Sequence, residues 1–230
     1  MTPTGAIIQP VGCTHTDHFK LMIRSFIYDR LILPLTSRWY AEVLRRVLED
    51  AALLDVGIGT AGALMANTDL VTQKRLRVTG IDINAEYVER ARRRLRASPL
   101  SSCAEVRLES VYDHQGGPYD AVYFSGSFML LPDPERALRH CAALLNPSGR
   151  IYFTQTLQTR PAPWLETLKP KLRQLTSIDF GHVTYEDDFK AQIRAAGLEL
   201  EEFTIVAREG SRASCIAVAR RGGAEHDGAG

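Results

Sequence analysis

The loop between residues 52 and 62, ALLDVGIGTAG, carries the residues whose types and spacing point most directly to chemistry. Gly57, Gly59 and Gly62 follow the G-x-G-x-x-G spacing of loops that let a pyrophosphate approach the backbone at a helix N-terminus. Asp82 stands 20 residues after Gly62, where an acid can accept hydrogen bonds from a ribose. The loop therefore predicts a ligand that contains a nucleoside, and two kinds of ligand fit this much of the pattern.

Asp55 ends the apolar segment that leads into the loop, and it separates the two kinds of ligand. A pyrophosphate needs unopposed backbone N–H groups, and a carboxylate beneath the loop repels it. S-adenosylmethionine carries an ammonium and a sulfonium group, which the same carboxylate attracts. Asp82 suits either ligand, because both carry a ribose diol. Asp55 therefore favours S-adenosylmethionine over NAD, with S-adenosylhomocysteine as the product after methyl transfer.

Both acids must be positioned by strands, and the rest of the chain predicts those strands. Strand-like and helix-like segments alternate five times, which predicts a parallel sheet with helices on both faces. Glu209-Gly210-Ser211 joins the last two strand-like segments into a closing antiparallel hairpin. We expect an α/β fold, a single Rossmann-like doubly wound domain with a mostly parallel seven-stranded sheet. The expected strands are 53–56, 75–82, 104–110, 119–127, 150–157, 198–208 and 212–220, and the expected helices are 18–33, 35–49, 61–70, 84–98, 134–145 and 184–196.

One domain with additions at its ends is the expected organisation. Residues 1–49 form a tail and a helical lid, residues 50–220 form the ligand-binding domain, and residues 221–230 form a disordered tail. Residues 158–183 follow the fifth strand and break the strand–helix rhythm with three prolines. A long irregular segment at that edge of the sheet is typical of a lid over a substrate.

Charge and composition narrow the range of partners. The net charge is +1, and no segment is apolar over the roughly 18 residues of a membrane span. The N-terminus does not resemble a signal peptide, so we expect a cytoplasmic protein, either a monomer or a homodimer. The basic run at 90–96 is expected to be a solvated helix face and not a nucleic-acid surface. The cysteines include no C-x-x-C pair, and we expect reduced thiols and no metal site; they are Cys13, Cys103, Cys141 and Cys215.

Four blocks of the sequence, in order, resemble class I S-adenosylmethionine-dependent methyltransferases. They are LLDVGIGTAG, VTGIDINAEYVERARRRL, YDAVYFSGSFMLLPDPERALRHCAALLNPSGRIYFTQ and the final hairpin, which together cover about residues 50–157 and 184–219. Within that superfamily the chain is similar to the small-molecule group typified by quinone-biosynthesis C-methyltransferases. They too carry a Tyr-Asp-containing N-terminal helical segment, here FIYDRLILPLTSRW. The resemblance implies methyl transfer by direct displacement to a small, partly apolar molecule.

The resemblance also implies which residues hold the cofactor. Asp55 lies near the ammonium group, and Asp82 accepts from the ribose hydroxyls. We expect Asp82→Ala to weaken cofactor binding by roughly 1.5–3 kcal/mol and to leave the melting temperature without ligand nearly unchanged. Ala61 replaces a glycine that many members carry, which should tighten the loop slightly. The implied cofactor residues are Asp55, Gly57, Gly59, Thr60, Asp82, Ile83 on the adenine, Ser110 and Val111 at the adenine edge, and Ser125 near the methyl group.

The segment FSGSFMLLPD, at the end of the fourth strand, bears on the methyl acceptor. It lacks the Asn/Asp-Pro-Pro-Tyr/Phe element of enzymes that methylate planar nitrogens, and it gives a small apolar mouth. Core packing explains Phe128 equally well. His182 is the candidate general base because imidazole titrates near neutrality, and Tyr28 is a second catalytic candidate. The expected substrate-facing residues are Tyr28, Trp39, Tyr40, Ser127, Phe128, Trp164, Phe180 and His182.

Other functions stay open on these residues alone. A protein or RNA methyltransferase is the alternative among enzymes. A catalytically idle subunit that binds S-adenosylmethionine for a partner belongs to a different class, and a nicotinamide oxidoreductase is the residual alternative. The atom methylated is open among sulfur, nitrogen, oxygen and carbon.

Overall fold

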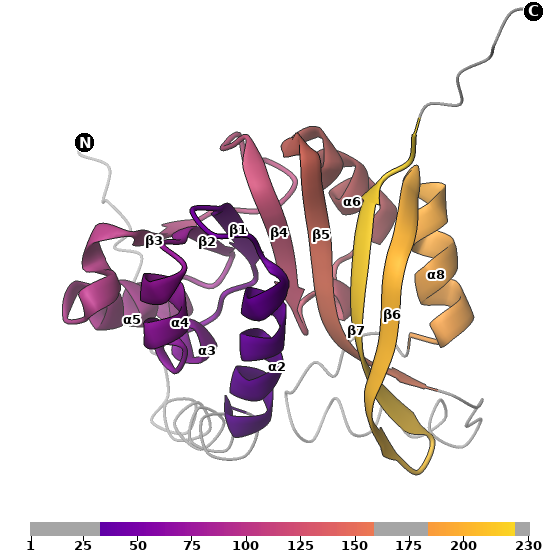
Figure 1. Cartoon of the computed structure of the whole chain (residues 1–230), viewed down its shortest axis with the longest axis horizontal. Coiled ribbons are helices and arrows are strands. Elements are labelled where there is room, and N and C mark those ends of the chain that lie inside the picture. The colour runs from indigo at the N-terminus through magenta and orange to yellow at the C-terminus, as the bar shows by residue number, and fades with distance from the viewer. Residues whose placement is uncertain (1–32, 159–183, 224–230) are drawn as a thin grey trace, which may run out of the picture.

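The computed structural model describes residues 33–158 and 184–223 of the chain. A seven-stranded sheet with the order β3-β2-β1-β4-β5-β7-β6 forms its centre, as Figure 1 shows. β7 is antiparallel to β5 and β6, and the other neighbouring strands are parallel, which confirms the expected sheet and its closing hairpin. The strands are β1 Ala52–Val56, β2 Arg77–Asp82, β3 Ala104–Leu108, β4 Tyr119–Ser125, β5 Leu145–Gln158, β6 Leu198–Glu209 and β7 Arg212–Arg221.

Helices cover both faces of the sheet. α2, α3, α4 and α5 pack on one face, and α6 and α8 pack on the other (Figure 1). Successive side chains of a strand point to opposite faces, so Leu53 joins the core under α2 and Leu54 joins the core under α6. The helices are α2 Leu33–Arg46, α3 Gly62–Met65, α4 Thr68–Gln73, α5 Ala85–Arg96, α6 Pro134–Ala143 and α8 Glu186–Ala195, with 3-10 turns at η2 Pro99–Ser102 and η3 Phe128–Leu130.

The sequence around α5 explains where this helix begins. Asn84 caps its N-terminus, since the side-chain oxygen accepts hydrogen bonds from the amides of Glu86 and Tyr87 at 3.0 and 3.2 Å. The first turn carries an acid and the last turn carries arginines, and both suit the helix dipole. The buried face of α5 consists of Val88, Ala91 and Leu95.

Two helices differ from their expected bounds. Residues 61–70, expected as one helix, form the separate helices α3 and α4. The side-chain amide of Asn67 at this junction donates to the carbonyl oxygen of Ala63 at 2.8 Å. α2 begins before the expected position and includes Pro34 in its first turn, where a proline deprives the helix of no hydrogen bond. The expected helix 18–33 lies outside the described residues apart from Leu33.

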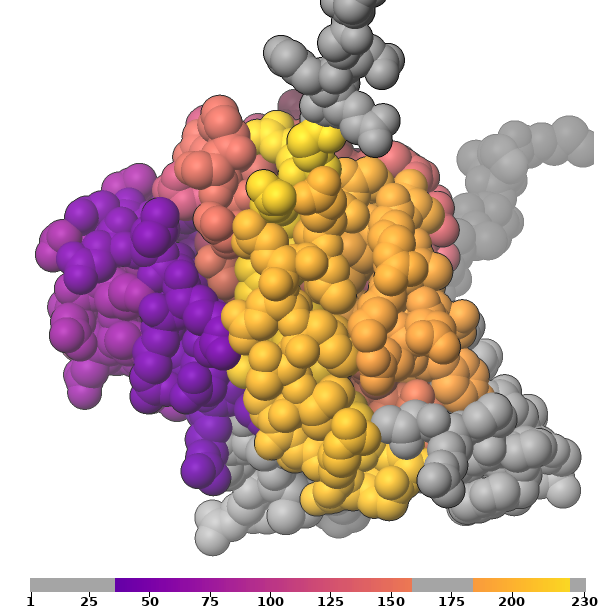
Figure 2. All heavy atoms as spheres, turned by 45° about the vertical axis from the view of Figure 1, so that its right-hand side comes forward, coloured from indigo at the N-terminus to yellow at the C-terminus, as the bar shows by residue number. Residues whose placement is uncertain are grey.

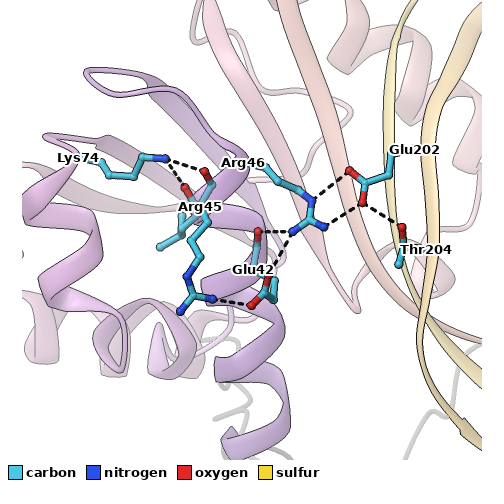
Figure 3. Close-up of polar contacts among 7 residues, drawn as sticks. Glu42, Arg45, Arg46, Lys74, Glu202 and Thr204 are labelled. Carbon is cyan, nitrogen blue, oxygen red and sulfur yellow. Dashed lines mark hydrogen bonds and ion pairs between the residues drawn. The ribbon is translucent and has the colours of Figure 1, made fainter.

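The C-terminal end of α2 is anchored to both sides of the molecule (Figure 3). Lys74, just after α4, donates to the carbonyl oxygens of Leu44 and Arg45, both at 2.9 Å. A cation at a helix C-terminus stabilises the helix through its exposed carbonyl groups. Arg46 forms an ion pair with Glu202 of β6, with 2.9 Å between Nη2 and Oε1. The helix therefore bridges the first half of the sheet and the closing hairpin.

The remainder of α2 is also packed against the domain. Asn67 donates from its side chain to the carbonyl oxygen of Ser37 at 3.0 Å. The inward side chains of α2 and of the residue after it are fully buried in the core on that face of the sheet, and they are Tyr40, Val43, Leu44 and Val47. The described part of the expected N-terminal lid, residues 33–49, thus packs against the domain mainly through α2.

The edge of the sheet that holds the site is formed by the carboxyl ends of β1, β2, β4 and β5. The turn between β6 and β7 lies at the same edge (Figure 1), and the hairpin forms the flank between α2 and α8 (Figure 2). The amide of Gln158 donates to the carbonyl oxygen of Thr184 at 3.0 Å, and Gln158 also pairs with Tyr185. Both ends of the expected lid insertion 158–183 therefore meet at the end of β5, while residues 159–183 lie outside the described part.

The three cysteines in the described part of the chain are free thiols. Cys141 and Cys215 are buried and Cys103 is half-buried, while Cys13 lies outside the described part. Burial raises the pKa of all three thiols, to about 12 for Cys141 and Cys215, which makes them poor nucleophiles. Between residues 33 and 158 and between 184 and 223, every helix is too short or too polar to cross a bilayer.

Candidate cofactor site

The loop between β1 and α3 places its first two glycines in left-handed conformations. Gly57 has a φ of 76° and Gly59 a φ of 60°, which side chains with a Cβ rarely adopt. A Cβ on Gly57 would lie 2.5 Å from the Cβ of Ser127, at the end of β4. The amide of Gly57 donates to the carbonyl oxygen of Ile81 at 2.8 Å. The loop is therefore a tight turn packed between β2 and β4.

Ala61 occupies the loop position where the resemblance seen in the sequence leads one to expect a third glycine. It has a φ of 57° and a ψ of 20°, in the left-handed region. A residue with a Cβ pays roughly 1–2 kcal/mol for this conformation. The consequence is backbone strain at the start of α3, and not only the slight tightening that the size of alanine predicts.

Part of the basic run at 90–96 supports the loop. Arg94 donates to the hydroxyl and the carbonyl oxygen of Thr60, at 2.9 and 3.2 Å. Arg92 donates from Nε to the carbonyl oxygen of Val106 at 2.9 Å. The run is only in part the solvated face expected from the sequence, because these two arginines fix a loop and a strand.

Asp55 lies beneath the loop and is 1% exposed. The hydroxyl of Tyr40 donates to its Oδ2 at 2.7 Å, and its Oδ1 has no hydrogen-bond partner in the described part of the chain. The pKa of Asp55 is raised to about 7: burial is the main cause, the hydrogen bond from Tyr40 opposes it, and the charge of Asp82 adds to it. A buried carboxylate oxygen without a partner is suited to a cationic ligand group.

The raised pKa of Asp55 has a defined effect on stability. The unfolded chain releases this proton near pH 4, whereas the folded protein keeps it up to about pH 7. The contribution of Asp55 to folding is therefore greatest below pH 4 and is lost as the pH rises to 7. At neutral pH the folded protein holds a carboxylate that a bound cation would stabilise.

Asp82 ends β2 and binds two backbone amides. Its Oδ2 accepts from the amide of Gly59 at 2.9 Å, and its Oδ1 accepts from the amide of Asn84 at 2.8 Å. The side chain is partly exposed, so it can also accept from a ligand hydroxyl. These bonds are a reason to expect that Asp82 also contributes to the stability of the protein without ligand, beyond what the sequence predicts.

An apolar rim follows Asp82 at the same edge of the sheet. Ile83 is 79% exposed, and Leu108 at the end of β3 is 51% exposed. Asp82 and Leu108 are paired in the register of β2 and β3, so the two apolar side chains belong to neighbouring strand ends. This placement suits the packing of Ile83 on an adenine ring.

The third block of expected cofactor residues is divided between surface and core. The Ser110 hydroxyl accepts from the amide of Tyr112 at 3.3 Å, and its carbonyl oxygen accepts from the amides of Asp113 and His114. Val111 is buried in the core under α6 and does not present its side chain at the edge. Ser125, the last residue of β4, is partly exposed beside the loop.

The described residues expected to face the substrate lie mainly in packed positions. Phe128 is 2% exposed, and its ring contacts those of Phe124, Phe153 and Phe189 at centroid distances of 5.5, 5.2 and 5.7 Å. The core-packing explanation therefore applies to Phe128. Ser127 donates from its hydroxyl to the carbonyl oxygen of Val56, so its side chain is held against the loop.

The remaining expected substrate residues are unevenly placed. Tyr40 is buried against Asp55 and does not line an open apolar wall, whereas Trp39 is partly exposed on α2. Both catalytic candidates and two of the aromatic residues lie outside the described part of the chain. These are Tyr28, Trp164, Phe180 and His182.

Gln155, on β5, is a buried polar residue that sequence reasoning missed. It is 1% exposed, and neither its Nε2 nor its Oε1 has a partner among the described residues. It lies between Phe153 and Leu157 in the strand, at a position whose side chain points inward. A polar residue at an inward strand position was the signal that could have identified it.

His114 is a second buried polar residue that the pattern analysis did not single out. Its Nδ1 lies 2.6 Å from Oε2 of Glu109, and its Nε2 lies 2.8 Å from the hydroxyl of Tyr119. Both ring nitrogens are thus engaged within the connection from β3 to β4. These contacts explain His114 as a structural residue of that connection.

Comparison with known sequences gives consistent matches over the site. A family model described as "Methyltransferase domain" matches residues 54–151. The ubiquinone biosynthesis O-methyltransferase of Bordetella avium (strain 197N) is 32% identical over 174 residues, which cover 73% of this chain and 70% of that protein. The protein of the same name from Xanthomonas axonopodis pv. citri (strain 306) is 32% identical over 160 residues, covering 66% of this chain and 64% of that protein. The chain thus spans about two thirds of the length of these relatives.

Comparison with solved structures extends the likeness to the fold. The [4+2]-cyclase SpnF has a TM-score of 0.66 at 16% identity, covering 81% of both chains. The mitomycin 7-O-methyltransferase MmcR has a TM-score of 0.65 at 21% identity, covering 89% of this chain and 59% of that one. A geranyl diphosphate methyltransferase solved with S-adenosylmethionine has a TM-score of 0.66 at 14% identity, covering 91% and 93%. At these identities the structural likeness concerns the fold alone, and a cyclase is among the proteins that share it.

Proposed function

The chain belongs to the class I S-adenosylmethionine-dependent methyltransferases, and on that premise we propose that it methylates a hydroxyl group of a small, partly apolar molecule. The relatives from Bordetella and Xanthomonas are named as O-methyltransferases, and so is the mitomycin enzyme. Phenols and catechols with apolar substituents are the acceptors that we propose.

The observation that carries the cofactor assignment is Oδ1 of Asp55, which has no partner among the described residues. It lies beneath a loop whose glycines Gly57 and Gly59 hold left-handed conformations, and the residue is buried. An unpaired buried polar atom is costly unless a ligand or water completes it. The ammonium group of S-adenosylmethionine supplies hydrogen-bond donors and a positive charge, so the residues present fit this cofactor.

Each proposed cofactor residue has a definite task. Asp55 binds the ammonium group, Asp82 shares its carboxylate between the loop and the ribose, and Ile83 packs on the adenine. The apolar rim formed with Leu108 keeps water from that part of the ligand. The remaining proposed contacts are Gly57, Gly59 and Thr60 at the methionine part, Ser110 at the adenine edge, and Ser125 near the methyl group.

The reaction needs positioning more than acid–base chemistry. S-adenosylmethionine, when bound, supplies an electrophilic methyl group on a good leaving group. The protein must hold the acceptor oxygen in line with that methyl group and exclude water, which can contribute on the order of 7–11 kcal/mol. For a hydroxyl acceptor a base must take the proton, and His182 and Tyr28 stay the proposed candidates for that task.

A binding measurement followed by a turnover assay tests the proposal. Isothermal calorimetry should show binding of S-adenosylhomocysteine and no binding of NAD. Incubation with S-adenosylmethionine and a matched set of aromatic acceptors, bearing hydroxyl, amine or thiol groups on the same apolar frame, should methylate the hydroxyl compounds. Mass spectrometry identifies the methylated atom after fragmentation.

Two results would replace the proposal with one of its alternatives. Cofactor binding without turnover of any small acceptor, but with methyl transfer to protein or RNA, would make the chain a macromolecular methyltransferase. Cofactor binding with no transfer to any acceptor would favour a subunit that binds S-adenosylmethionine for a partner. Binding of NAD in place of S-adenosylhomocysteine would overturn the cofactor assignment itself.

A further inference from the structure

Tyr40 of α2 and Asp55 of β1 form a buried polar pair on the face of the sheet that α2 covers. The phenol donates to Oδ2 of the carboxylate at 2.7 Å, and both side chains are 1% exposed. The ring of Tyr40 packs edge-on against that of Tyr123 at a centroid distance of 5.0 Å. The carboxylate therefore has one oxygen held by α2 and one oxygen without a partner among the described residues.

The position of Tyr40 does not depend on its bond to Asp55. Asn67 holds α2 at the carbonyl oxygen of Ser37, one turn before Tyr40. The ion pair with Glu202 and the Lys74 cap hold the other end of the helix (Figure 3). The helix thus delivers a phenol to a fixed point beneath the glycine loop.

The titratable groups that face Asp55 come from three elements. Tyr40 comes from α2, Tyr123 from β4, and Asp82 from the end of β2. Burial and the negative charge of Asp82 both disfavour the ionised carboxylate. The hydrogen bond from Tyr40 favours it, whereas the hydroxyl of Tyr123 is 2.8 Å from the hydroxyl of Thr154, a contact that does not involve the carboxylate.

We propose that Tyr40 is a positioning residue of the cofactor site: its phenol holds one oxygen of the Asp55 carboxylate and keeps the other oxygen available for the ammonium group of S-adenosylmethionine. This inference rests on the proposed function, since it assigns a role within the same site. Tyr40 acts through Asp55 and does not touch the reacting atoms.

The proposal predicts a cofactor affinity that depends on pH in a specific way. Asp55 has a pKa of about 7 in the protein without ligand, so it is about half ionised at pH 7. Removal of the Tyr40 hydroxyl raises that pKa, and a rise of about one unit leaves roughly a tenth ionised at pH 7. Binding of the ammonium group should then be about fivefold weaker at pH 7, and only about 1.1-fold weaker at pH 9.

The experiment is calorimetric titration of S-adenosylhomocysteine into wild type and Tyr40→Phe between pH 6 and pH 9. The ratio of the two dissociation constants removes the titration of the ligand's own amino group, which is common to both. Tyr123→Phe is the matched control, because it removes a buried phenol from the neighbouring ring without touching Asp55. We expect a ratio of about five at pH 7 that falls toward one at pH 9 for Tyr40→Phe, and a ratio near one throughout for Tyr123→Phe.

A ratio for Tyr40→Phe that stays constant with pH would overturn the proposal and make Tyr40 a packing residue. The same holds for a pH dependence that Tyr123→Phe reproduces. If Tyr40→Phe does not fold, 3-fluorotyrosine at position 40 decides the matter. Its more acidic phenol is the stronger donor, so binding at pH 7 should become tighter than in wild type, and unchanged binding would overturn the proposal. Failure of the wild-type protein to bind S-adenosylhomocysteine would instead contradict the proposed function.

Discussion

The two halves of the carboxyl edge are built from different materials. At the ends of β1 and β2 the edge consists of glycines with positive φ and two carboxylates, Asp55 and Asp82, bound to a phenol and to backbone amides. At the ends of β4 and β5 the described core is dominated by tightly packed aromatic rings, with the polar Gln155 buried beside them. Four phenylalanine rings meet there, and they are Phe124, Phe128, Phe153 and Phe189.

The two halves therefore differ in what they contribute to cofactor binding and to stability. The first half uses backbone geometry and buried charge, the features that we propose bind the cofactor. The second half uses packed side chains that carry stability, and the residues proposed to select the acceptor adjoin it in sequence. Substitutions in the second half should therefore lower stability without changing cofactor affinity, whereas substitutions in the first half should change both.

The largest effect on stability is expected from Phe153→Ala. Phe153 is fully buried, and its ring contacts those of Phe124, Phe128 and Phe189. Loss of a buried phenylalanine side chain should lower the free energy of unfolding by about 3–5 kcal/mol, measured by urea denaturation. Phe203→Ala, whose ring is only half-buried, is the control and should lower it less. If folded Phe153→Ala bound S-adenosylhomocysteine tenfold more weakly, the two halves would not be separable.

A smaller effect, on both stability and binding, is expected from Gly57→Ala. The new Cβ would lie 2.5 Å from the Cβ of Ser127, and the alanine would have to adopt the φ of 76° that Gly57 has. The strain and the overlap together should lower the free energy of unfolding by about 2–4 kcal/mol. Gly59→Ala is the matched control, since Gly59 has a φ of 60° and no atom of the described residues lies within 4 Å of the added Cβ. Equal decreases in the free energy of unfolding for the two variants would show that the contact with Ser127 does not contribute to the effect.

Asp82→Ala should weaken cofactor binding and lower the stability of the protein together. Removal of the carboxylate leaves the amides of Gly59 and Asn84 without their acceptor. We expect the free energy of unfolding without ligand to fall by about 1.5–3 kcal/mol, and cofactor binding to weaken by a similar amount. Thermal unfolding and calorimetry measure the two effects, and Asp82→Asn should retain part of both. An unchanged melting temperature would restore the view that Asp82 serves the ligand alone.

The fold could be predicted because its signals are local. The alternation of strands and helices, the Asn84 cap and the turn at Gly210 each reside in a few adjacent residues. Element bounds were less accessible where distant contacts decide them. Residues 61–70 form two helices, and at their junction Asn67 binds the carbonyl oxygen of Ser37 in α2, a contact between segments far apart in sequence.

The cofactor half of the site was more accessible than the acceptor half for a physical reason. A tight loop requires glycine at fixed positions, and a buried acid such as Asp55 is rare enough to be informative. An apolar residue such as Phe128 reads the same whether it packs in the core or faces a substrate. The pairing of Tyr40 with Asp55 was not predictable, because it depends on how α2 crosses the sheet.

The smallest effect is expected from Ala61→Gly, which tests whether the glycine loop is strained in this chain. Ala61 has a φ of 57° and is fully buried. Glycine would relieve roughly 1–2 kcal/mol of left-handed strain. It would also lose about 0.8 kcal/mol from the buried methyl group and about 0.4–1 kcal/mol through the greater freedom of the unfolded chain.

The opposing contributions of Ala61→Gly nearly cancel, so its free energy of unfolding should stay within about 0.5 kcal/mol of wild type by urea denaturation. Ala66→Gly is the control, because Ala66 is exposed and has a φ of −67° with no strain to relieve. It should lower the free energy of unfolding by about 0.5–1 kcal/mol. If Ala61→Gly lowered the free energy of unfolding by as much as Ala66→Gly or more, relief of strain would be negligible. The alanine would then be a well-packed residue of the loop. If the free energy of unfolding of Ala61→Gly nearly equals that of wild type while that of Ala66→Gly is lower, the strain of the loop is offset by burial of one methyl group.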